Sequence, residues 1–342
     1  MINKKISFLL ISGVLILVIV LVAFVFPKGK SLKIKKEFEI QGLTWRTFSY
    51  YYNDSIYQQG YNWLANWRFL RKAKKAGGNF LLVRAFYNGN DQGGLVGNEE
   101  KAKKVLKGAI EQAHKAGFKI LLVPYVESRE YWVNKKWWLS KDVWTKTVLK
   151  WAKFAQENNV EMFAPGVEMN IILNESEVGE WFKEILPKIR EVYFGIVTTA
   201  EHYDVEKWKI LDEAQAFAGY DCLGFTFFPR KEYNGVSDIR SFDDYKEYVE
   251  KEAKVIDMLS EKYHIQCKLA VPMGLDYWKE SHLKKPVPDA EIVAQATSFG
   301  LDILKKHNFT GVFISHWASE PDHFGKNTAV EEMLQKRWTL AE

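Results

Sequence analysis

Cysteine is scarce in this sequence, and its scarcity limits the chemistry that the chain can perform. The 342 residues contain two cysteines, Cys222 and Cys267. Two are too few for a disulfide-stapled scaffold or for the metal sites that cysteine ligands usually build. The two could pair if they lie on neighbouring strands, but buried free thiols are the state that we expect.

A strong excess of charge of one sign is also missing. The net charge of +5 results from 48 basic and 43 acidic residues, and lysine-rich helix faces are mixed with glutamates. Proteins that bind nucleic acid usually concentrate positive charge on one face or in one run. We therefore expect no nucleic acid partner.

Motifs that bind cofactors, metals or acyl substrates are absent. The glycines at Gly93–Gly97 lack the spacing of a phosphate-binding loop. No pair among His202, His316 and His323 has a tight metal-ligand spacing, and Ser315 has no nucleophile-elbow motif around it. We expect neither a cofactor nor a metal ion.

Aromatic and other apolar residues are abundant. The sequence is 47% hydrophobic and contains thirteen tryptophans and sixteen tyrosines. This composition supports a large folded core rather than disorder. Aromatic rings either fill such a core or line grooves that stack flat apolar faces, including those of sugar rings.

The amino-terminal segment is a candidate membrane span. Ile6–Phe26 is an uncharged apolar run that follows Lys4 and Lys5, and it is long enough to cross a bilayer as one helix. We expect a signal anchor or signal peptide over residues 1–27, with the anchor favoured because no small-residue cleavage site follows. A linker over residues 28–36 then leads to a domain at 37–342. The lysines of the linker argue for a cytoplasmic carboxyl-terminal side, but the function inferred below favours an extracytoplasmic or secreted domain.

The remainder of the chain repeats one unit of a strand followed by a helix. Strand-like apolar runs occur at Phe38–Trp45, Asn79–Tyr87, Phe118–Tyr125, Val160–Glu168, Phe194–Ala200, Cys222–Phe228, Cys267–Met273 and Gly311–Trp317. Helical patterns occur at Tyr61–Ala76, Glu99–Ala116, Thr145–Asn158, Ser176–Tyr193, Val205–Ala218, Phe242–Tyr263, Ala290–His307 and Asn327–Trp338. Gly77 and Gly117 follow Lys-Ala pairs and are typical helix C-caps. Eight alternations predict an α/β fold of the (β/α)₈ TIM-barrel type.

The fourth predicted strand delivers a carboxylate. The run Val160–Asn170 is mostly apolar and contains a bend at Pro165 and Gly166. The strand that it predicts ends at Glu168. In a (β/α)₈ barrel the reacting groups lie at the carboxyl ends of the strands. Taken alone, Glu168 is equally well explained as a carboxylate at the start of a surface helix.

The other predicted strand ends carry a mixture of carboxylates, aromatic rings and a few cations. The candidates for substrate contacts are Trp45, Arg84, Tyr87, Glu127, Asn170, His202, Phe228, Trp278, Trp317 and Glu320. Carboxylates accept hydrogen bonds from hydroxyl groups, while aromatic rings cover the C–H face of a sugar. The mixture indicates a carbohydrate substrate, although any one of these polar residues could instead form a helix cap or a turn.

Two motifs resemble those of the clan of retaining (β/α)₈ glycoside hydrolases. Gly166–Asn170 is similar to the segment that carries the acid/base glutamate at the end of strand four. Tyr220–Pro229 resembles a strand-six segment of the family 113 β-mannanases and the family 53 galactanases. The resemblance implies a site arginine at Arg84 and a platform tryptophan at Trp317.

The sequence departs from the pattern of that clan at two positions. Val167 stands where the family often has an asparagine that contacts the 2-hydroxyl group of the sugar. Gly274 stands where the strand-seven nucleophile glutamate is expected. Asp276, two residues further on, is the first candidate for the second carboxylate, and Glu201 and Glu320 are alternatives.

These features predict a membrane-anchored or secreted glycoside hydrolase that cleaves a β-linked polysaccharide or oligosaccharide. Glu168 would be the general acid, and Asp276 or Glu201 the nucleophile or base. Because the strand-seven glutamate is missing, a barrel that binds glycans at a surface without cleaving them is the alternative. A barrel with unrelated chemistry is a third possibility, because one fold hosts many functions.

Overall fold

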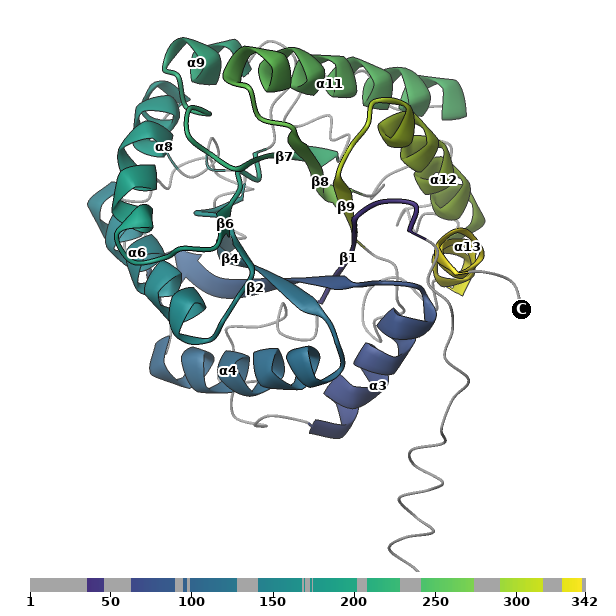
Figure 1. The fold of residues 1–342 in the computed structure, drawn as a ribbon, viewed down its shortest axis with the longest axis horizontal. Helices are drawn as coiled ribbons and strands as arrows, with labels where there is room; N and C mark the ends of the chain where they lie inside the picture. Colours follow the sequence, from purple (N-terminus) through teal and green to yellow (C-terminus); the bar gives the residue numbers. More distant parts are fainter. Residues whose placement is uncertain are drawn as a thin grey trace, which may run out of the picture.

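The computed structural model describes residues 36–45, 63–89, 95–96, 99–127, 141–167, 169, 173, 175–201, 208–227, 241–273, 290–315 and 328–339. Figure 1 shows a ring of helices around a barrel of strands, viewed along the barrel.

In these ranges, eight parallel strands form the barrel wall. They are β1 (Ile40–Thr44), β2 (Phe80–Gly89), β4 (Lys119–Glu127), β5 (Met162–Phe163), β6 (Ile196–Val197), β7 (Cys222–Phe227), β8 (Cys267–Met273) and β9 (Gly311–Ile314). Their order is β6-β5-β4-β2-β1-β9-β8-β7. Single bridges from Thr198 to Cys222 and from Glu201 to Phe225 bring β6 beside β7. The barrel is therefore nearly closed.

Eight helices within the described ranges cover the outside of the barrel (Figure 1). They are α3 (Trp63–Lys75), α4 (Glu99–Lys115), α6 (Lys141–Glu157), α8 (Glu175–Arg190), α9 (Trp208–Glu213), α11 (Phe242–Tyr263), α12 (Ala290–Lys306) and α13 (Thr328–Trp338). Each strand is followed by a helix, as the alternating pattern predicted. The (β/α)₈ fold is thus confirmed.

The structure differs from the prediction in a few elements. The short strand β3 (Leu95–Val96) pairs antiparallel with the end of β2, and the sequence pattern did not indicate it. β5 and β6 comprise two residues each, and α9 comprises six. In these places the chain follows the wall with only brief regular pairing.

The apolar residues form two layers, one inside the barrel and one between the wall and the helices. The interior cluster consists of Ile40, Phe80, Leu82, Leu121, Val123, Met162, Ala164, Val167, Ala200, Cys222, Leu269, Val271 and Phe313. The outer cluster is larger and joins alternate strand residues to all the helices. Because successive side chains on a strand point to opposite faces, buried strands supply both layers. Gly42 faces the interior, where the ring of Phe313 occupies the space that a Cβ would need.

The two glycine caps predicted from the Lys-Ala-Gly sequences are confirmed. Gly77 follows α3 with a φ of 86°, and Gly117 follows α4 with a φ of 79°. Residues with side chains rarely adopt this left-handed backbone conformation. Each glycine therefore ends its helix and turns the chain into the next strand.

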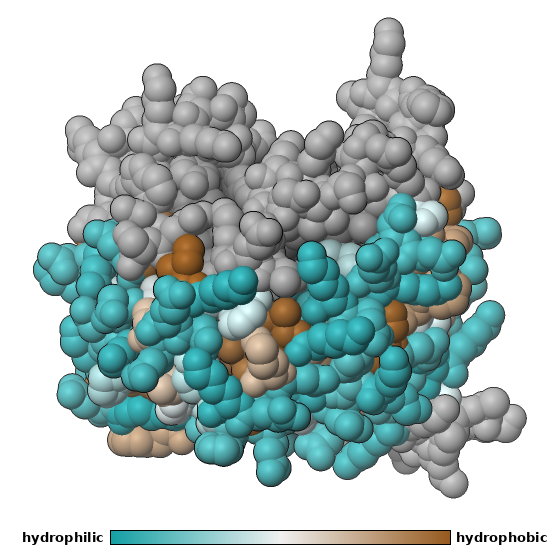
Figure 2. Space-filling model, turned by 90° about the horizontal axis from the view of Figure 1, so that it is seen from above, coloured by the Kyte–Doolittle hydropathy of each residue, from teal (hydrophilic) through white to brown (hydrophobic). Residues whose placement is uncertain are grey.

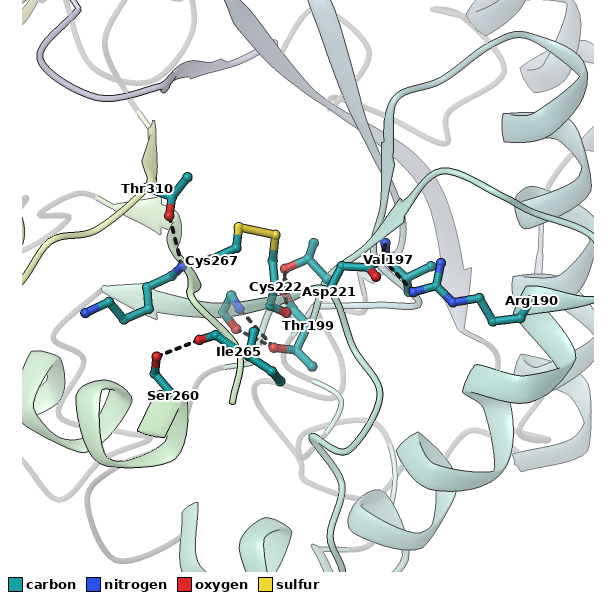
Figure 3. Close-up of a disulfide and its surroundings, with 12 residues drawn as sticks. Arg190, Val197, Thr199, Asp221, Cys222, Ser260, Ile265, Cys267 and Thr310 are labelled. Carbon is teal, nitrogen blue, oxygen red and sulfur yellow. Dashed lines mark hydrogen bonds and ion pairs between the residues drawn. A yellow bond between two sulfur atoms is a disulfide. The ribbon is translucent and has the colours of Figure 1, made fainter. Parts of the chain in front are cut away.

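The two cysteines form a disulfide, so the expectation of free thiols is wrong (Figure 3). Cys222 in β7 and Cys267 in β8 are direct partners in the parallel register. Their Cα atoms are 4.6 Å apart, within the range that a disulfide requires. The prediction failed because the sequence does not disclose the register between two strands.

Among the described residues, no helix is both long and apolar enough to span a membrane. The predicted span at Ile6–Phe26 lies outside these residues and stays a prediction. The described surface in Figure 2 is largely hydrophilic, with scattered hydrophobic residues.

Candidate active site

The carboxyl ends of the parallel strands meet at one end of the barrel, which we call the rim. β2 and β4 pair over their full length, from Phe80 opposite Lys119 to Asn88 opposite Glu127. Glu127 is thus the last residue of β4 and lies at the rim. In (β/α)₈ enzymes this end of the barrel holds the active site.

Arg84 lies on the inner side of β2, in the same alternating row as Phe80 and Leu82 of the interior cluster. Its guanidinium carbon is 4.9 Å from the centroid of the Tyr125 ring. Tyr125 in turn packs against the interior cluster. This cation–π contact fixes a positive charge above the apolar interior, on the side of the rim. Arg84 is partly buried, and its Nε atom is enclosed.

Trp45 and Tyr87 lie on the other side of the wall, in the outer cluster. Trp45 is fully buried, and its ring stacks on Phe69 of α3 with the centroids 5.1 Å apart. Tyr87 is 5% exposed, and its hydroxyl group accepts a hydrogen bond of 2.5 Å from the Trp151 indole N–H. Neither ring offers an open face to a sugar in this conformation.

The segment that leads to Glu168 is held by backbone pairing and close packing. The Ala164 N–H donates to the Leu122 carbonyl oxygen at 3.1 Å, which extends the pairing with β4 beyond β5. A Cβ at Gly166 would overlap with the side chain of Met169. Glycine is therefore required here by the close approach of Met169, and the path of the chain on both sides of Glu168 is constrained.

Glu201 is the one predicted catalytic carboxylate among the described residues, and it is fully buried. Both of its carboxylate oxygens accept a hydrogen bond from the Met169 N–H, at 3.0 and 3.2 Å. Burial raises the pKa of Tyr220 well above its usual value, and the negative charge of Glu201 raises it further. The Glu201 carboxylate thus lies near Tyr220 and holds the backbone that directly follows Glu168. The sequence indicated a carboxylate at this strand end but not this contact.

Most of the other predicted site residues lie outside the described ranges. This applies to Glu168, Asp276, Asn170, His202, Phe228, Trp278, Trp317 and Glu320, and to the side chain of Glu127. Their roles stay predictions. Among the side chains that the structure describes, no group of three His, Cys, Asp or Glu residues could hold a metal ion.

β8 is irregular just before the position of the missing glutamate. The register between β8 and β9 shifts between Ala270 and Met273, and a shift also occurs between β7 and β8. Irregular pairing of this kind changes the direction of the side chains that follow. Counting along the sequence therefore does not decide which residue after Met273 faces the rim.

The family model of Glycoside Hydrolase Family 113 matches residues 97–263 of this chain. The matched region extends from the start of α4 to the end of α11 and includes Glu168 and Glu201. The match stops before β8. Gly274 and Asp276, which follow the end of this strand in the sequence, are therefore not included. No curated protein sequence matches the chain.

Solved structures of glycoside hydrolases share the fold of the chain. A GH113 β-1,4-mannanase is 16% identical with a TM-score of 0.61, covering 87% of this chain and 99% of its own. The GH113 β-mannanase of Alicyclobacillus acidocaldarius is 14% identical with a TM-score of 0.60, covering 88% and 96%. Fungal β-1,4-galactanases are 11% identical with a TM-score of 0.55, covering 87% and 99%. Together with the family match, these likenesses confirm the predicted resemblance.

Proposed function

We propose that this protein is a glycoside hydrolase that acts on a β-linked polysaccharide. The observation that carries the proposal is the family 113 match over residues 97–263, because it includes the strand-four segment with Glu168. The barrel supplies the rim on which such enzymes act. The mannanase and galactanase relatives favour a β-linked backbone of neutral sugars, and a β-mannan is the first substrate to test.

In the proposed mechanism, Glu168 donates a proton to the oxygen of the scissile glycosidic bond, so that the leaving sugar departs as an alcohol. The second carboxylate either attacks the anomeric carbon or removes a proton from the attacking water. In the first case, water later hydrolyses the glycosyl-enzyme ester and Glu168 takes the proton of that water. A carboxylate separation of about 5 Å indicates the first mechanism, and one of about 6.5–9.5 Å the second.

Asp276 is the proposed second carboxylate. The irregular pairing of β8 supports it, because a shifted register allows a residue beyond Gly274 to face the rim. Glu201 is less suited to attack a sugar, since it is fully buried and both of its oxygens are engaged by the Met169 N–H. We assign it the role of holding the chain next to Glu168. Glu320 remains the third candidate.

Arg84 is the proposed anchor for a sugar hydroxyl group, and Trp278 and Trp317 are the proposed stacking platforms. The position of Arg84 over Tyr125 supports its assignment. Trp45 and Tyr87 would act indirectly, by fixing α3 and α6 against the wall, because their rings are enclosed.

We further propose that the barrel is extracytoplasmic, either anchored by Ile6–Phe26 or secreted. The Cys222–Cys267 disulfide supports this location, because disulfides persist in oxidising compartments and are rare in the cytosol. A polysaccharide substrate outside the cell is compatible with the same location.

The decisive experiment measures reducing ends released from β-mannan, galactan, β-glucan and xylan. Glu168→Gln should lower turnover by about 10²-fold or more, because the leaving sugar then departs without general acid catalysis. Glu177→Gln, at an exposed position of α8, is the matched control and should retain full activity. Undiminished activity of Glu168→Gln would refute the assignment of the general acid.

The second candidate function is a glycan-binding barrel that does not cleave its ligand. The glycine at position 274 favours it, because the usual nucleophile is missing there. Retention of polysaccharide by both the unaltered protein and Glu168→Gln, with no release of reducing ends, would establish this function instead.

A further inference from the structure

The end of the barrel opposite the rim is formed by the starts of the strands and the last turns of the helices. We call it the basal face. Glu37, just before β1, pairs with Arg337 in the last turn of α13, at 2.5 Å. The chain therefore enters the barrel at the basal face, beside α13 and α3 (Figure 1).

The place of entry limits how far the barrel can lie from the apolar segment at Ile6–Phe26. The linker of residues 28–36 spans at most about 30 Å even when fully extended. If the apolar segment crosses a bilayer, the barrel is tethered close to the lipid surface. The tether is attached to the basal face, so this face is the one nearest the headgroups.

The helix ends at the basal face are predominantly basic. Six of the described helices carry basic residues in their last turn, namely Lys72, Lys74, Lys75, His114, Lys115, Lys188, Arg190, Lys262, Lys305, Lys306, Lys336 and Arg337. Some have acidic partners: Arg190 pairs with Asp221 at 2.5 Å and Lys262 with Asp212 at 2.7 Å.

Most of the exposed lysines in these last turns that have no acidic partner in the described structure lie near the chain entry, and Lys188 of α8 is the exception. Lys75, Lys115, Lys305 and Lys336 belong to α3, α4, α12 and α13, the helices on the β1 side of the barrel (Figure 1). The exposed acids in this half are Glu39, Glu111, Glu332 and Asp302, the last of which pairs with Arg337, while Lys72 and Lys306 add exposed positive charge to the same helices. Other exposed acids of the basal face, Glu191, Glu213 and Glu261, lie toward α8, α9 and α11.

Phe194 adds an apolar group to the same face. It lies between α8 and β6 and is 76% exposed, and Ile196 beside it is 39% exposed. The loop is held in place, because the Phe194 N–H donates to Gln156 Oε1 and Arg190 donates to the Gly195 carbonyl oxygen, each at 2.9 Å. The ring is thus presented to solvent from a fixed backbone.

A purely structural explanation covers only part of these observations. Basic residues in the last turn of a helix stabilise the helix dipole, which accounts for the sign of the charge. It does not account for a large exposed aromatic ring on the same face. Lysines together with an exposed apolar ring are the groups by which peripheral surfaces bind anionic lipid headgroups.

We infer that the basal face docks on an anionic lipid surface, with the lysines of α3, α4, α12 and α13 on the headgroups and Phe194 at the interface. The lipid surface is that of the membrane in which the same chain is anchored. Docking directs the rim away from the membrane. This inference does not depend on the proposed hydrolase activity.

The test uses the full chain in lipid nanodiscs and a fluorophore at a single introduced thiol. The only two cysteines are joined in the disulfide, so Ala218→Cys, at an exposed position ahead of β7 on the basal face, supplies the one free thiol and leaves Phe194 in place. Asp243→Cys, at the first turn of α11 and thus at the rim end, is the control, since its side chain is 88% exposed. The quencher is a nitroxide on the lipid headgroup. One set of nanodiscs contains about 30% phosphatidylglycerol and the other only phosphatidylcholine.

The label at position 218 should be quenched at least about twofold more than the label at 243 in the anionic nanodiscs, and high salt should remove the difference. Lys75→Glu with Lys115→Glu should lower the quenching at 218 to the phosphatidylcholine level. Lys146→Glu with Lys209→Glu, exposed lysines nearer the rim, makes the same charge change and should not. Equal quenching at 218 and 243, or equal quenching in both lipid compositions, would overturn the inference.

Discussion

At the scale of single residues, the contact between Glu201 and Met169 links two strand ends that are distant in sequence. A fully buried carboxylate is costly unless it is hydrogen-bonded, and here it accepts the N–H that directly follows Glu168. This hydrogen bond explains why Glu201 can be buried. It also holds the backbone next to Glu168, the proposed general acid. In the proposed mechanism, the Glu201 side chain acts through the backbone and need not touch the substrate.

Glu201→Ala should lower the free energy of unfolding by about 1–3 kcal/mol, because it leaves the buried Met169 N–H without its acceptor. Denaturant unfolding would measure this loss. Glu201→Gln keeps one acceptor oxygen and should lose less.

The pH profile of hydrolysis separates positioning from attack. If Glu201 holds the segment, Glu201→Gln shifts the basic limb, which reports the general acid, and keeps measurable turnover. A loss of turnover by Glu201→Gln as large as that of Glu168→Gln, with the fold intact, would instead make Glu201 the second carboxylate.

At the scale of elements, the disulfide joins two neighbouring strands at the basal end of the barrel. Cys222 and Cys267 are separated by 45 residues, and this loop includes α11. Figure 3 shows the bridge between β7 and β8, with Asp221 and Arg190 nearby. The cross-link restricts the unfolded chain and holds together the starts of the two strands, which lie at the end of the barrel opposite the rim.

Replacing both cysteines with serine should lower the free energy of unfolding by about 2–4 kcal/mol, since a closed loop of this length loses about 4 kcal/mol of chain entropy in the simplest model. Thermal unfolding of the oxidised, reduced and doubly substituted proteins would measure it. Reduced and substituted proteins should unfold at similar temperatures. Identical stability of the oxidised and reduced forms would show that the bridge is not formed in solution.

At the scale of the whole molecule, a partly buried polar contact at the basal end couples the stability of the barrel to pH. Glu161 precedes β5 and accepts hydrogen bonds from the Ile120 N–H at 2.8 Å and from His114 at 3.3 Å. Burial raises the pKa of Glu161, but the hydrogen bonds from His114 and Ile120 outweigh burial, and the pKa is lowered.

A lowered folded-state pKa means that the carboxylate stabilises the fold above its unfolded pKa and loses this effect as the pH falls through the folded value. Stability should therefore decline in acid below about pH 4.5. Glu161→Gln should make the acid decline shallower by less than about 1 kcal/mol, because solvent screens this half-exposed group. Urea unfolding over a range of pH is the measurement. An unchanged acid decline would assign the effect to other groups.

The number and order of the strands and helices that form the barrel were determined by the sequence alone. Runs of apolar residues that alternate with amphipathic helical patterns are compatible with few folds other than a (β/α)₈ barrel, and glycines such as Gly77 and Gly117 end helices by local backbone chemistry. These signals are local, so they can be recognised without knowledge of distant contacts.

The tertiary structure alone decided which side chains meet. Trp45 and Tyr87 lie on the outer side of the wall rather than in the mouth, because one step along a strand moves a side chain to the opposite face. The pairing of Cys222 with Cys267 depends on the register of β7 and β8, and the contact of Glu201 with the Met169 N–H depends on how two strand ends approach. Register and approach are set by the packing of the whole barrel, so no local pattern in the sequence discloses them.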